Sequence, residues 1–359
     1  MLPALRGPAR RDTTGCAMRD VGNGLRKTGS EGGRDSARIE QRSSETQMHG
    51  VKLKYCDSDF KVGWPAILEG TMQSNKAIRI FAEATAIVTG GASGIGRALA
   101  EELAKRGSEV ILADLQVDLA EKVASEIHAS GGKAKAVKID VTDFLAMERL
   151  VQETVERTER LDYIFNNAGI AIGGPVHLYS IEDWNQTIDV NLRGVINGIQ
   201  AAYRVMIAQG FGHIINTASM AGLLSGPGSV AYTTTKHAVV GLSKSLRAEA
   251  SQTGVRVSVL CPGVIRTPIL EGGKYGKMLI DIPPEQVRQL WEKLKPMAPN
   301  LFAEKVLKSV AKNRAIIIVP SWWKKYWWIN RLSPSLGIFL SQKRFQKVQK
   351  ELGKEIKRP

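Results

Sequence analysis

The sequence has few cysteines and lacks a long hydrophobic run without polar interruptions. Its three cysteines, Cys16, Cys56 and Cys261, are widely spaced, and none belongs to a Cys-x-x-Cys pair. This spacing offers no disulfide framework and no metal site, and it favours a reducing compartment such as the cytoplasm. The longest stretch without Lys, Arg, Asp or Glu, residues 205–235, contains His213 and several Ser, Thr and Gly residues, so it is not a membrane span.

Acidic residues are outnumbered by basic ones, 35 against 50, which gives a formal net charge of +15. Such an excess suggests a polyanionic partner, and its location along the chain helps to identify that partner. Residues 312–359 contain 12 Lys and Arg but only two acids, together with four of the seven tryptophans. The excess is therefore largely a property of the C-terminal tail. Because no nucleic-acid recognition motif accompanies it, nucleic acid is not an expected partner.

Residues 1–83 show neither strand-like nor helix-like periodicity, and their apolar runs are short. We expect a disordered extension, or a start assigned too early, since Met72 lies shortly before the first predicted strand. Acids such as Asp12 and Glu31 argue against an organellar presequence, and no apolar run at the start forms a signal peptide. Peptides from residues 1–71 in the native cell would refute the early-start interpretation.

From residue 84 to residue 320, short apolar runs alternate with amphipathic segments. This alternation is typical of a parallel sheet with helices on both faces, and it predicts an α/β fold with a doubly wound, seven-stranded parallel sheet. The predicted strands are residues 85–89, 109–113, 135–139, 163–166, 213–218, 256–260 and 315–319. The predicted helices are residues 95–105, 117–129, 144–158, 181–208, 232–251 and 303–312.

A glycine-rich turn joins the first predicted strand to the first predicted helix. The turn reads Gly90-Gly-Ala-Ser-Gly94-Ile-Gly96. Its glycines allow the backbone to approach a pyrophosphate closely, and the start of the helix offers free N–H groups to an anion. The next strand ends at Asp114, 20 residues beyond Gly94, where a carboxylate can bind both ribose hydroxyls of adenosine. Because it would repel a phosphate on that ribose, Asp114 favours NAD over NADP.

Tyr232 and Lys236 have the i, i+4 spacing that places two residues one turn apart on the same helix face. A cation near a phenol favours the phenolate and lowers its pKa toward the range useful for general acid/base catalysis. Ser219 follows a predicted strand, 13 residues before the tyrosine. The three residues form a candidate catalytic group, although a Tyr-x-x-x-Lys pair alone is also found as a surface pair with an extended lysine.

Together these segments resemble the short-chain dehydrogenase/reductase family, which has a single Rossmann-like domain. The resemblance covers about residues 85–319, two thirds of the chain. It rests on motifs that stand in the family's order: Thr89-Gly-Gly-Ala-Ser-Gly-Ile-Gly96, Asp114, Asp140-Val141, Asn166-Asn-Ala-Gly169, Asn191, Ser219, Tyr232, Lys236 and Pro262-Gly263.

The resemblance implies an alcohol dehydrogenase or ketone reductase in which hydride passes between the substrate carbon and a nicotinamide. Tyr232 would exchange a proton with the substrate oxygen, and Ser219 would hold that oxygen. Lys236 would lower the tyrosine pKa and bind the nicotinamide ribose. Asn191 would hold a water that links the lysine to solvent.

The resemblance also implies a set of cofactor-binding residues along the carboxyl ends of the strands. Ser93 stands where family members that prefer NADP often have a basic residue, which again favours NAD. Asp140 would meet the adenine edge, and Thr267 would contact the nicotinamide side. The full set is Gly90, Ser93, Gly94, Ile95, Gly96, Asp114, Asp140, Val141, Asn167, Ala168, Gly169, Tyr232, Lys236, Pro262, Gly263 and Thr267.

The substrate is expected to lie beneath three segments beyond the strand ends, residues 170–177, 220–228 and 265–300. Apolar stretches in them favour a hydrophobic alcohol or ketone, although ordinary lid packing gives the same pattern. A homo-oligomer is the usual state of the family. A nucleotide-binding regulator without turnover, or a membrane-associated scaffold, stands as the alternative function.

Residues 321–359 form a basic tail with aromatic residues on neighbouring helical turns. Indole rings beside lysines suit the surface of an anionic membrane, where the protein would associate peripherally. The same pattern also suits an arm that packs on its own core or on a partner subunit. The sequence leaves both interpretations open.

Overall fold

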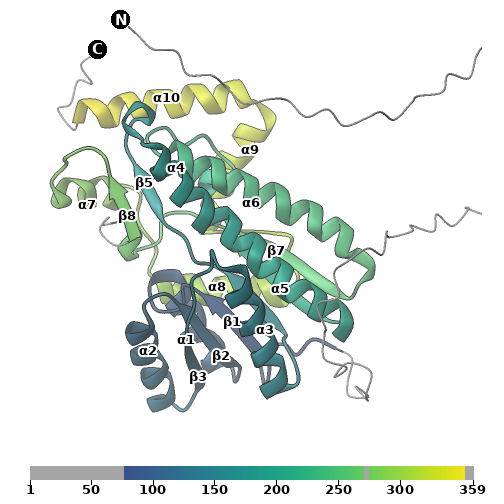
Figure 1. Ribbon diagram of the computed structural model, residues 1–359. Helices are drawn as coiled ribbons and strands as arrows, with labels where there is room; N and C mark the ends of the chain where they lie inside the picture. Colours follow the sequence, from purple (N-terminus) through teal and green to yellow (C-terminus); the bar gives the residue numbers. More distant parts are fainter. Residues whose placement is uncertain (1–76, 271–274, 352–359) are drawn as a thin grey trace, which may run out of the picture. The chain divides into compact units, whose positions relative to one another are not determined.

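The computed structural model describes residues 77–270 and 275–351, so expectations for residues 1–76, 271–274 and 352–359 lie outside the described residues. Seven parallel strands form the central sheet in the order β3-β2-β1-β4-β6-β7-β9 (Figure 1), which confirms the predicted fold class. The strands are β1 Thr85–Thr89, β2 Glu109–Asp114, β3 Lys133–Lys138, β4 Tyr163–Asn166, β6 Gly212–Thr217, β7 Val255–Pro262 and β9 Ile316–Val319.

Alternating apolar side chains give the sheet two buried faces. In β1, Ile87 belongs to one core cluster, whereas Ala86 and Val88 belong to the other. Three helices pack on each face because each carries an apolar stripe toward the sheet. Helices α3 Phe144–Thr158, α5 Gly194–Gln209 and α6 Val230–Glu249 cover one face, and α1 Gly94–Lys105, α2 Val117–Ala129 and α8 Pro299–Ala311 cover the other.

The strand order reverses beside β1, which pairs with β2 on one side and with β4 on the other. In an open parallel sheet, such a reversal leaves a crevice outside the carboxyl ends of the strands. Thr89, the last residue of β1, is hydrogen-bonded to the segment that follows β4. Its hydroxyl accepts hydrogen bonds from the backbone N–H groups of Asn167 at 2.9 Å and Ala168 at 3.1 Å. The crevice therefore lies where the glycine-rich turn begins.

Three features differ from the predicted elements. The predicted helix over residues 181–208 is divided into α4 Ile181–Ile188, a π-helical turn Asp189–Arg193 and α5. A second, two-stranded sheet joins β5 Ala171–Gly173 to β8 Gly276–Met278, and an unpredicted helix α7 Pro284–Glu292 follows it. Helix α8 starts earlier than predicted, because Pro299 is pre-organised for the first helical turn.

The last described residues form two helices, α9 Lys324–Leu332 and α10 Pro334–Glu351, preceded by the short turn Ser321–Trp323. We call residues 321–351 the C-terminal arm. Gly337 allows the two helices to approach, since a Cβ there would lie 2.2 Å from Asn330 Oδ1. Figure 1 shows α10 at the same end of the fold as α4, α7 and the β5–β8 pair, and Trp323 is buried in the core. None of the helices within residues 77–351 is long and apolar enough to cross a bilayer.

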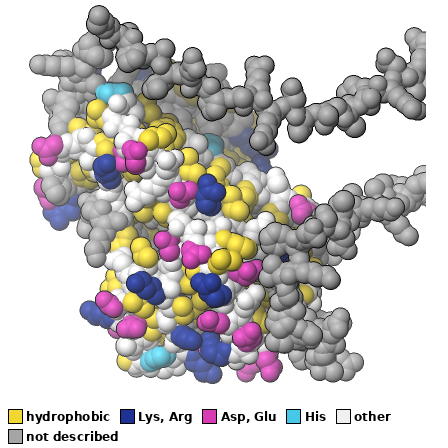
Figure 2. Space-filling view, viewed as in Figure 1, with side chains coloured by type: hydrophobic (Ala, Val, Ile, Leu, Met, Phe, Trp, Pro, Cys, Tyr) yellow, Lys and Arg dark blue, Asp and Glu magenta, His cyan; other side chains and the backbone are white. Residues whose placement is uncertain are grey.

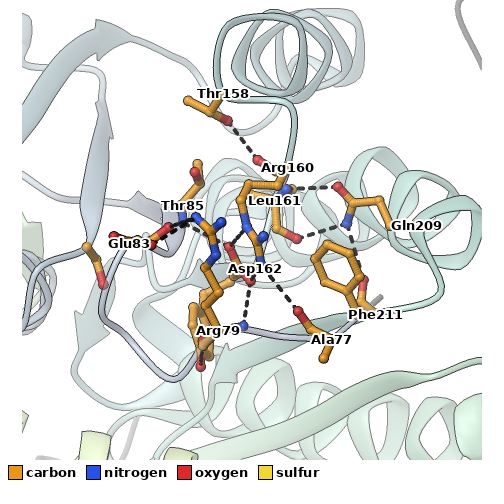
Figure 3. Close-up of polar contacts among 12 residues, drawn as sticks. Ala77, Arg79, Glu83, Thr85, Thr158, Arg160, Leu161, Asp162, Gln209 and Phe211 are labelled. Carbon is orange, nitrogen blue, oxygen red and sulfur yellow. Dashed lines mark hydrogen bonds and ion pairs between the residues drawn. The ribbon is translucent and has the colours of Figure 1, made fainter. Parts of the chain in front are cut away.

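The opposite ends of the strands are fixed by a buried carboxylate, Asp162 (Figure 3). It accepts hydrogen bonds from the backbone N–H groups of Arg79 at 2.9 Å and Thr85 at 3.0 Å, and it pairs with Arg160. Phe81 is buried nearby. The ordered contacts of the domain therefore begin before residue 84, which the sequence predicts as its first residue.

Candidate active site

The glycine-rich turn has the backbone geometry of a cradle for an anion. Gly90 and Gly94 have φ values of +64° and +53°, which favour glycine. A Cβ at Gly96 would lie 2.0 Å from the Gly90 carbonyl oxygen, so only glycine allows α1 to start this close to the turn. Ser93 makes no side-chain cap on α1, which leaves the first N–H groups of the helix available to a phosphate.

Asp114 lies at the carboxyl end of β2, buried beside the turn. Its two carboxylate oxygens accept hydrogen bonds from the backbone N–H groups of Ala92 at 3.0 Å and Gln116 at 2.9 Å. These bonds hold a negative charge at the edge of the crevice. Asp140 lies at the next strand end, where it accepts two hydrogen bonds from Thr142.

One large cavity, about 1370 Å³, runs from the turn to the C-terminal arm. It exceeds the usual range for a single small ligand, so a dinucleotide and a substrate fit the space together. Of the predicted site residues, only Gly96, which packs beneath the turn, and Asn191, which is fully buried, are not part of its lining. The lining includes Gly90, Ser93, Gly94, Ile95, Asp114, Asp140, Val141, Asn167, Ala168, Gly169, Ser219, Tyr232, Lys236, Pro262, Gly263 and Thr267.

Ser219, Tyr232 and Lys236 meet on one wall of this cavity. Ser219 follows β6, Tyr232 lies in the first turn of α6, and Lys236 lies one turn further along. The Lys236 ammonium is buried, donates a hydrogen bond to the Thr217 carbonyl at 2.9 Å and lies 5.4 Å from the centre of the Tyr232 ring. The arrangement brings a hydroxyl, a phenol and a cation to one site.

Burial dominates the titration of this group. It raises the pKa of Tyr232 above its ordinary value of 10, although a hydrogen bond with Ser219 acts in the opposite direction. Burial also lowers the pKa of Lys236 from 10.5 to about 8. The direction for the tyrosine differs from the sequence prediction, because removing the phenol from water penalises the phenolate. A protonated phenol is therefore the predominant form near neutral pH.

Asn191 lies in the π-helical turn, behind the cavity wall. Its amide accepts a hydrogen bond from the Ile170 N–H at 2.8 Å and donates one to the Ile170 carbonyl at 2.9 Å. Asn191 Oδ1 and Lys236 Nζ both lie near Gly169, because a Cβ there would be 3.1 Å from the oxygen and 3.4 Å from the nitrogen. The asparagine thus fixes the backbone after β4, and its amide oxygen and the lysine ammonium are both close to Gly169.

The substrate end of the cavity includes residues that the sequence analysis did not assign to the site. Residues from the three predicted segments line it, including α7 within residues 265–300, and the C-terminal arm adds a further wall. Gly337, Leu340, Arg344 and Val348 recur at helical spacing in α10, and this periodicity is the signal that marks the inner face of the arm. The lining residues from the arm include Trp323, Tyr326, Ile329, Leu340, Phe345 and Val348.

The chain is similar to known oxidoreductases over its central part. The family profile described as short chain dehydrogenase matches residues 84–274. An uncharacterized oxidoreductase of Listeria innocua is 43% identical over 187 residues, which cover 52% of this chain and 75% of that protein. The 2,5-dichloro-2,5-cyclohexadiene-1,4-diol dehydrogenase LinX of Sphingobium indicum is 36% identical over 204 residues, 57% of this chain and 78% of that protein.

Solved structures have the same fold. A short chain dehydrogenase/reductase from Burkholderia phymatum in complex with NAD is 27% identical, with a TM-score of 0.62, and the match covers 79% of this chain and 99% of that one. A putative gluconate 5-dehydrogenase from Beutenbergia cavernae with bound NADP is 28% identical, with a TM-score of 0.60 and coverage of 69% and 100%. With the fold and the motifs in register, the chain belongs to the short-chain dehydrogenase/reductase family of oxidoreductases.

Proposed function

We propose that this oxidoreductase transfers a hydride between a nicotinamide cofactor and a hydrophobic alcohol or ketone, with Tyr232 as the general acid/base. The observation that carries the proposal is the convergence of Ser219, Tyr232 and Lys236 on the wall of the cavity that begins at the glycine cradle. A bound nicotinamide dinucleotide supplies the hydride acceptor or donor. The residues of the chain manage the proton and the position of the substrate.

In the reducing direction, the protonated Tyr232 phenol donates its proton to the substrate oxygen as hydride reaches the carbonyl carbon. In the oxidising direction, the phenolate takes the proton of the alcohol as hydride leaves the same carbon. Ser219 holds the oxygen by a hydrogen bond and stabilises its developing negative charge. Lys236, with a pKa of about 8, is mostly charged at neutral pH and favours the phenolate when it forms.

Lys236 and Asn191 have supporting roles in this proposal. The lysine binds the ribose hydroxyls next to the nicotinamide. The amide oxygen of Asn191 and the lysine ammonium both lie close to Gly169, and a water that bonds to both would give the proton a route to solvent. The side chain also holds Ile170 in place, so the asparagine acts by positioning.

The cofactor we propose is NAD. Asp114 is held at the edge of the crevice by two backbone N–H groups, and its charge opposes a ribose phosphate. The cradle fits a dinucleotide, since its glycines admit the backbone close to a pyrophosphate and the start of α1 is uncapped. The solved relatives with NAD and with NADP make a direct comparison of the two cofactors the appropriate test.

A second partner is favoured by the outer side of the C-terminal arm. Trp328, Leu332 and Phe339 are exposed. Residues 321–350 contain seven Lys and Arg and no acid, and five of the seven lie outside the cavity lining. By contrast, Figure 2 shows basic and acidic side chains intermixed over the region where α1, α2 and α3 lie in Figure 1. We propose peripheral binding of this arm to an anionic membrane, tested by sedimentation with phosphatidylserine vesicles at low salt.

A homo-oligomer is a further proposal, tested by light scattering on the purified chain.

The experiment that tests the enzymatic proposal is the absorbance of NADH at 340 nm with NAD and a panel of secondary alcohols, including sterols and long-chain alcohols. Titration with NAD accompanies it, because binding without turnover of any alcohol would favour a regulator. Absence of NAD and NADP binding would overturn the proposal itself.

A further inference from the structure

The C-terminal arm crosses the mouth of the substrate cavity and is attached on both sides of it. On one side, Asn330 Nδ2 donates a hydrogen bond to the Leu223 carbonyl at 3.1 Å, and the hydroxyls of Ser225 and Ser341 are hydrogen-bonded at 2.9 Å. On the other side, Glu351 pairs with Lys293, which follows α7, at 2.8 Å. The arm therefore closes the site as a fixed wall.

The inner face of the arm continues the apolar lining of the cavity. Phe345 packs on Gly228, where a Cβ would lie 3.1 Å from its ring, and Gly228 lies just before the helix that carries Tyr232. Ile329 and Leu340 line the same space. A substrate whose oxygen meets Tyr232 thus extends its remaining part along these side chains, and burial favours an apolar body there.

The rim of the cavity carries an excess of positive charge. Lys293, Arg344 and Lys347 all belong to its lining, and Glu351 is the acid among them. Glu351 is already bonded to Lys293 and shares its charge with Lys347, whereas Arg344 has no ion pair among the described residues. Lys277, also at the rim, is neutralised by Asp183 at 2.8 Å. An anionic group at the mouth would compensate the remaining charge.

We propose that the arm is the specificity-determining wall of the substrate site and that the substrate has an apolar body with an anionic end group, which lies at Arg344 and Lys347. This inference rests on the proposed function and names its substrate class. The arm lies outside the residues matched by the family profile, 84–274.

Binding of two matched probes, dodecanoate and its methyl ester, tests the proposal by titration calorimetry on the full chain with NAD. The Arg344→Gln/Lys347→Gln variant is expected to bind dodecanoate roughly three- to thirty-fold more weakly than the wild type, because exposed charge pairs contribute modestly. Its affinity for the ester is expected to stay within two-fold. The control variant Lys324→Gln/Lys325→Gln removes the same charge from α9, outside the cavity lining, and should leave both affinities unchanged.

A second variant tests the wall. Ile329→Ala/Phe345→Ala should weaken binding of both probes, because apolar contact is lost from the common part of the ligand.

Equal affinity of the charge variant and the wild type for dodecanoate would overturn the proposal. Loss of vesicle binding by the charge variant, with dodecanoate affinity unchanged, would assign the charges to a lipid headgroup and also overturn it. If NAD binds and neither probe does, this inference fails while the proposed function stands, and absence of NAD binding defeats the proposed function instead.

Discussion

The ammonium of Lys236 lies 5.4 Å from the centre of the Tyr232 ring and is hydrogen-bonded to the carbonyl of Thr217, the last residue of β6. One helical turn and one strand end thus fix a cation beside the phenol before any ligand arrives. Burial at this position destabilises the charged form of the Lys236 side chain. The pH dependence of folding reports this penalty.

Lys236→Met should change how stability depends on pH. In the folded chain the pKa of Lys236 is about 8, against an ordinary value of 10.5. The unfolded chain therefore binds more protons between these values, and the lysine makes wild-type stability rise with pH across this window. Between pH 7 and pH 10.5, the free energy of unfolding of the wild type should rise by about 3 kcal/mol more than that of the variant. Urea unfolding at both pH values measures the difference, and a pH-independent difference would contradict it.

Asp114→Ala should reduce the preference for NAD over NADP by about ten-fold or more, because removal of the carboxylate relieves repulsion of the ribose phosphate. Asp114→Asn separates charge from support of the turn, since an amide oxygen still accepts a backbone N–H. The ratio of kcat/KM values for the two cofactors is the measurement. An unchanged ratio in both variants would refute the role of Asp114 in cofactor choice.

Gly96→Ala should abolish or strongly weaken dinucleotide binding. The added methyl group would lie 2.0 Å from the Gly90 carbonyl oxygen, so the turn and the start of α1 must separate. Gly241→Ala in α6 is the matched control. Among the described residues, no atom outside the local helix backbone lies within 4 Å of its Cβ position, and the substitution stabilises the helix by up to about 1 kcal/mol. NAD titration by calorimetry compares the variants. Wild-type affinity in the Gly96 variant would show that the close approach is not required.

Asp162→Ala should lower the free energy of unfolding by about 3–5 kcal/mol, because the change leaves Arg160 and two backbone N–H groups without their common acceptor. NAD affinity of the folded variant should remain near that of the wild type, since Asp162 lies at the opposite ends of the strands. Thermal and urea unfolding measure the loss. A change below 1 kcal/mol would contradict the structural role in Figure 3.

Much of the fold follows from local sequence signals. Alternation in segments such as Ala86–Val88 predicts strands with two buried faces. The glycines from Gly90 to Gly96 predict a tight turn, and two of them adopt the positive φ values that favour glycine. The sequence also places Tyr232 and Lys236 one helical turn apart. These features depend on residues that are close along the chain, so periodicity and spacing are sufficient.

The remaining features depend on tertiary packing. The pairing of Ala171 with Gly276 joins two short segments that have no strand pattern of their own. Burial by distant elements raises the pKa of Tyr232. The sequence predicts a lowered pKa instead, because it shows the nearby Lys236 cation and not the burial. The place of the C-terminal arm over the cavity depends on contacts such as Asn330 with Leu223, which no local pattern specifies.

The central claim is that Tyr232 exchanges the proton with the substrate, and Tyr232→Phe tests it most directly. The variant keeps the ring and removes only the hydroxyl, so NAD affinity and melting temperature should match the wild type. With an alcohol that the wild type oxidises, NADH formation at 340 nm should fall by about 100- to 10,000-fold. Turnover within ten-fold of the wild type, in a folded variant that binds NAD normally, would contradict the account.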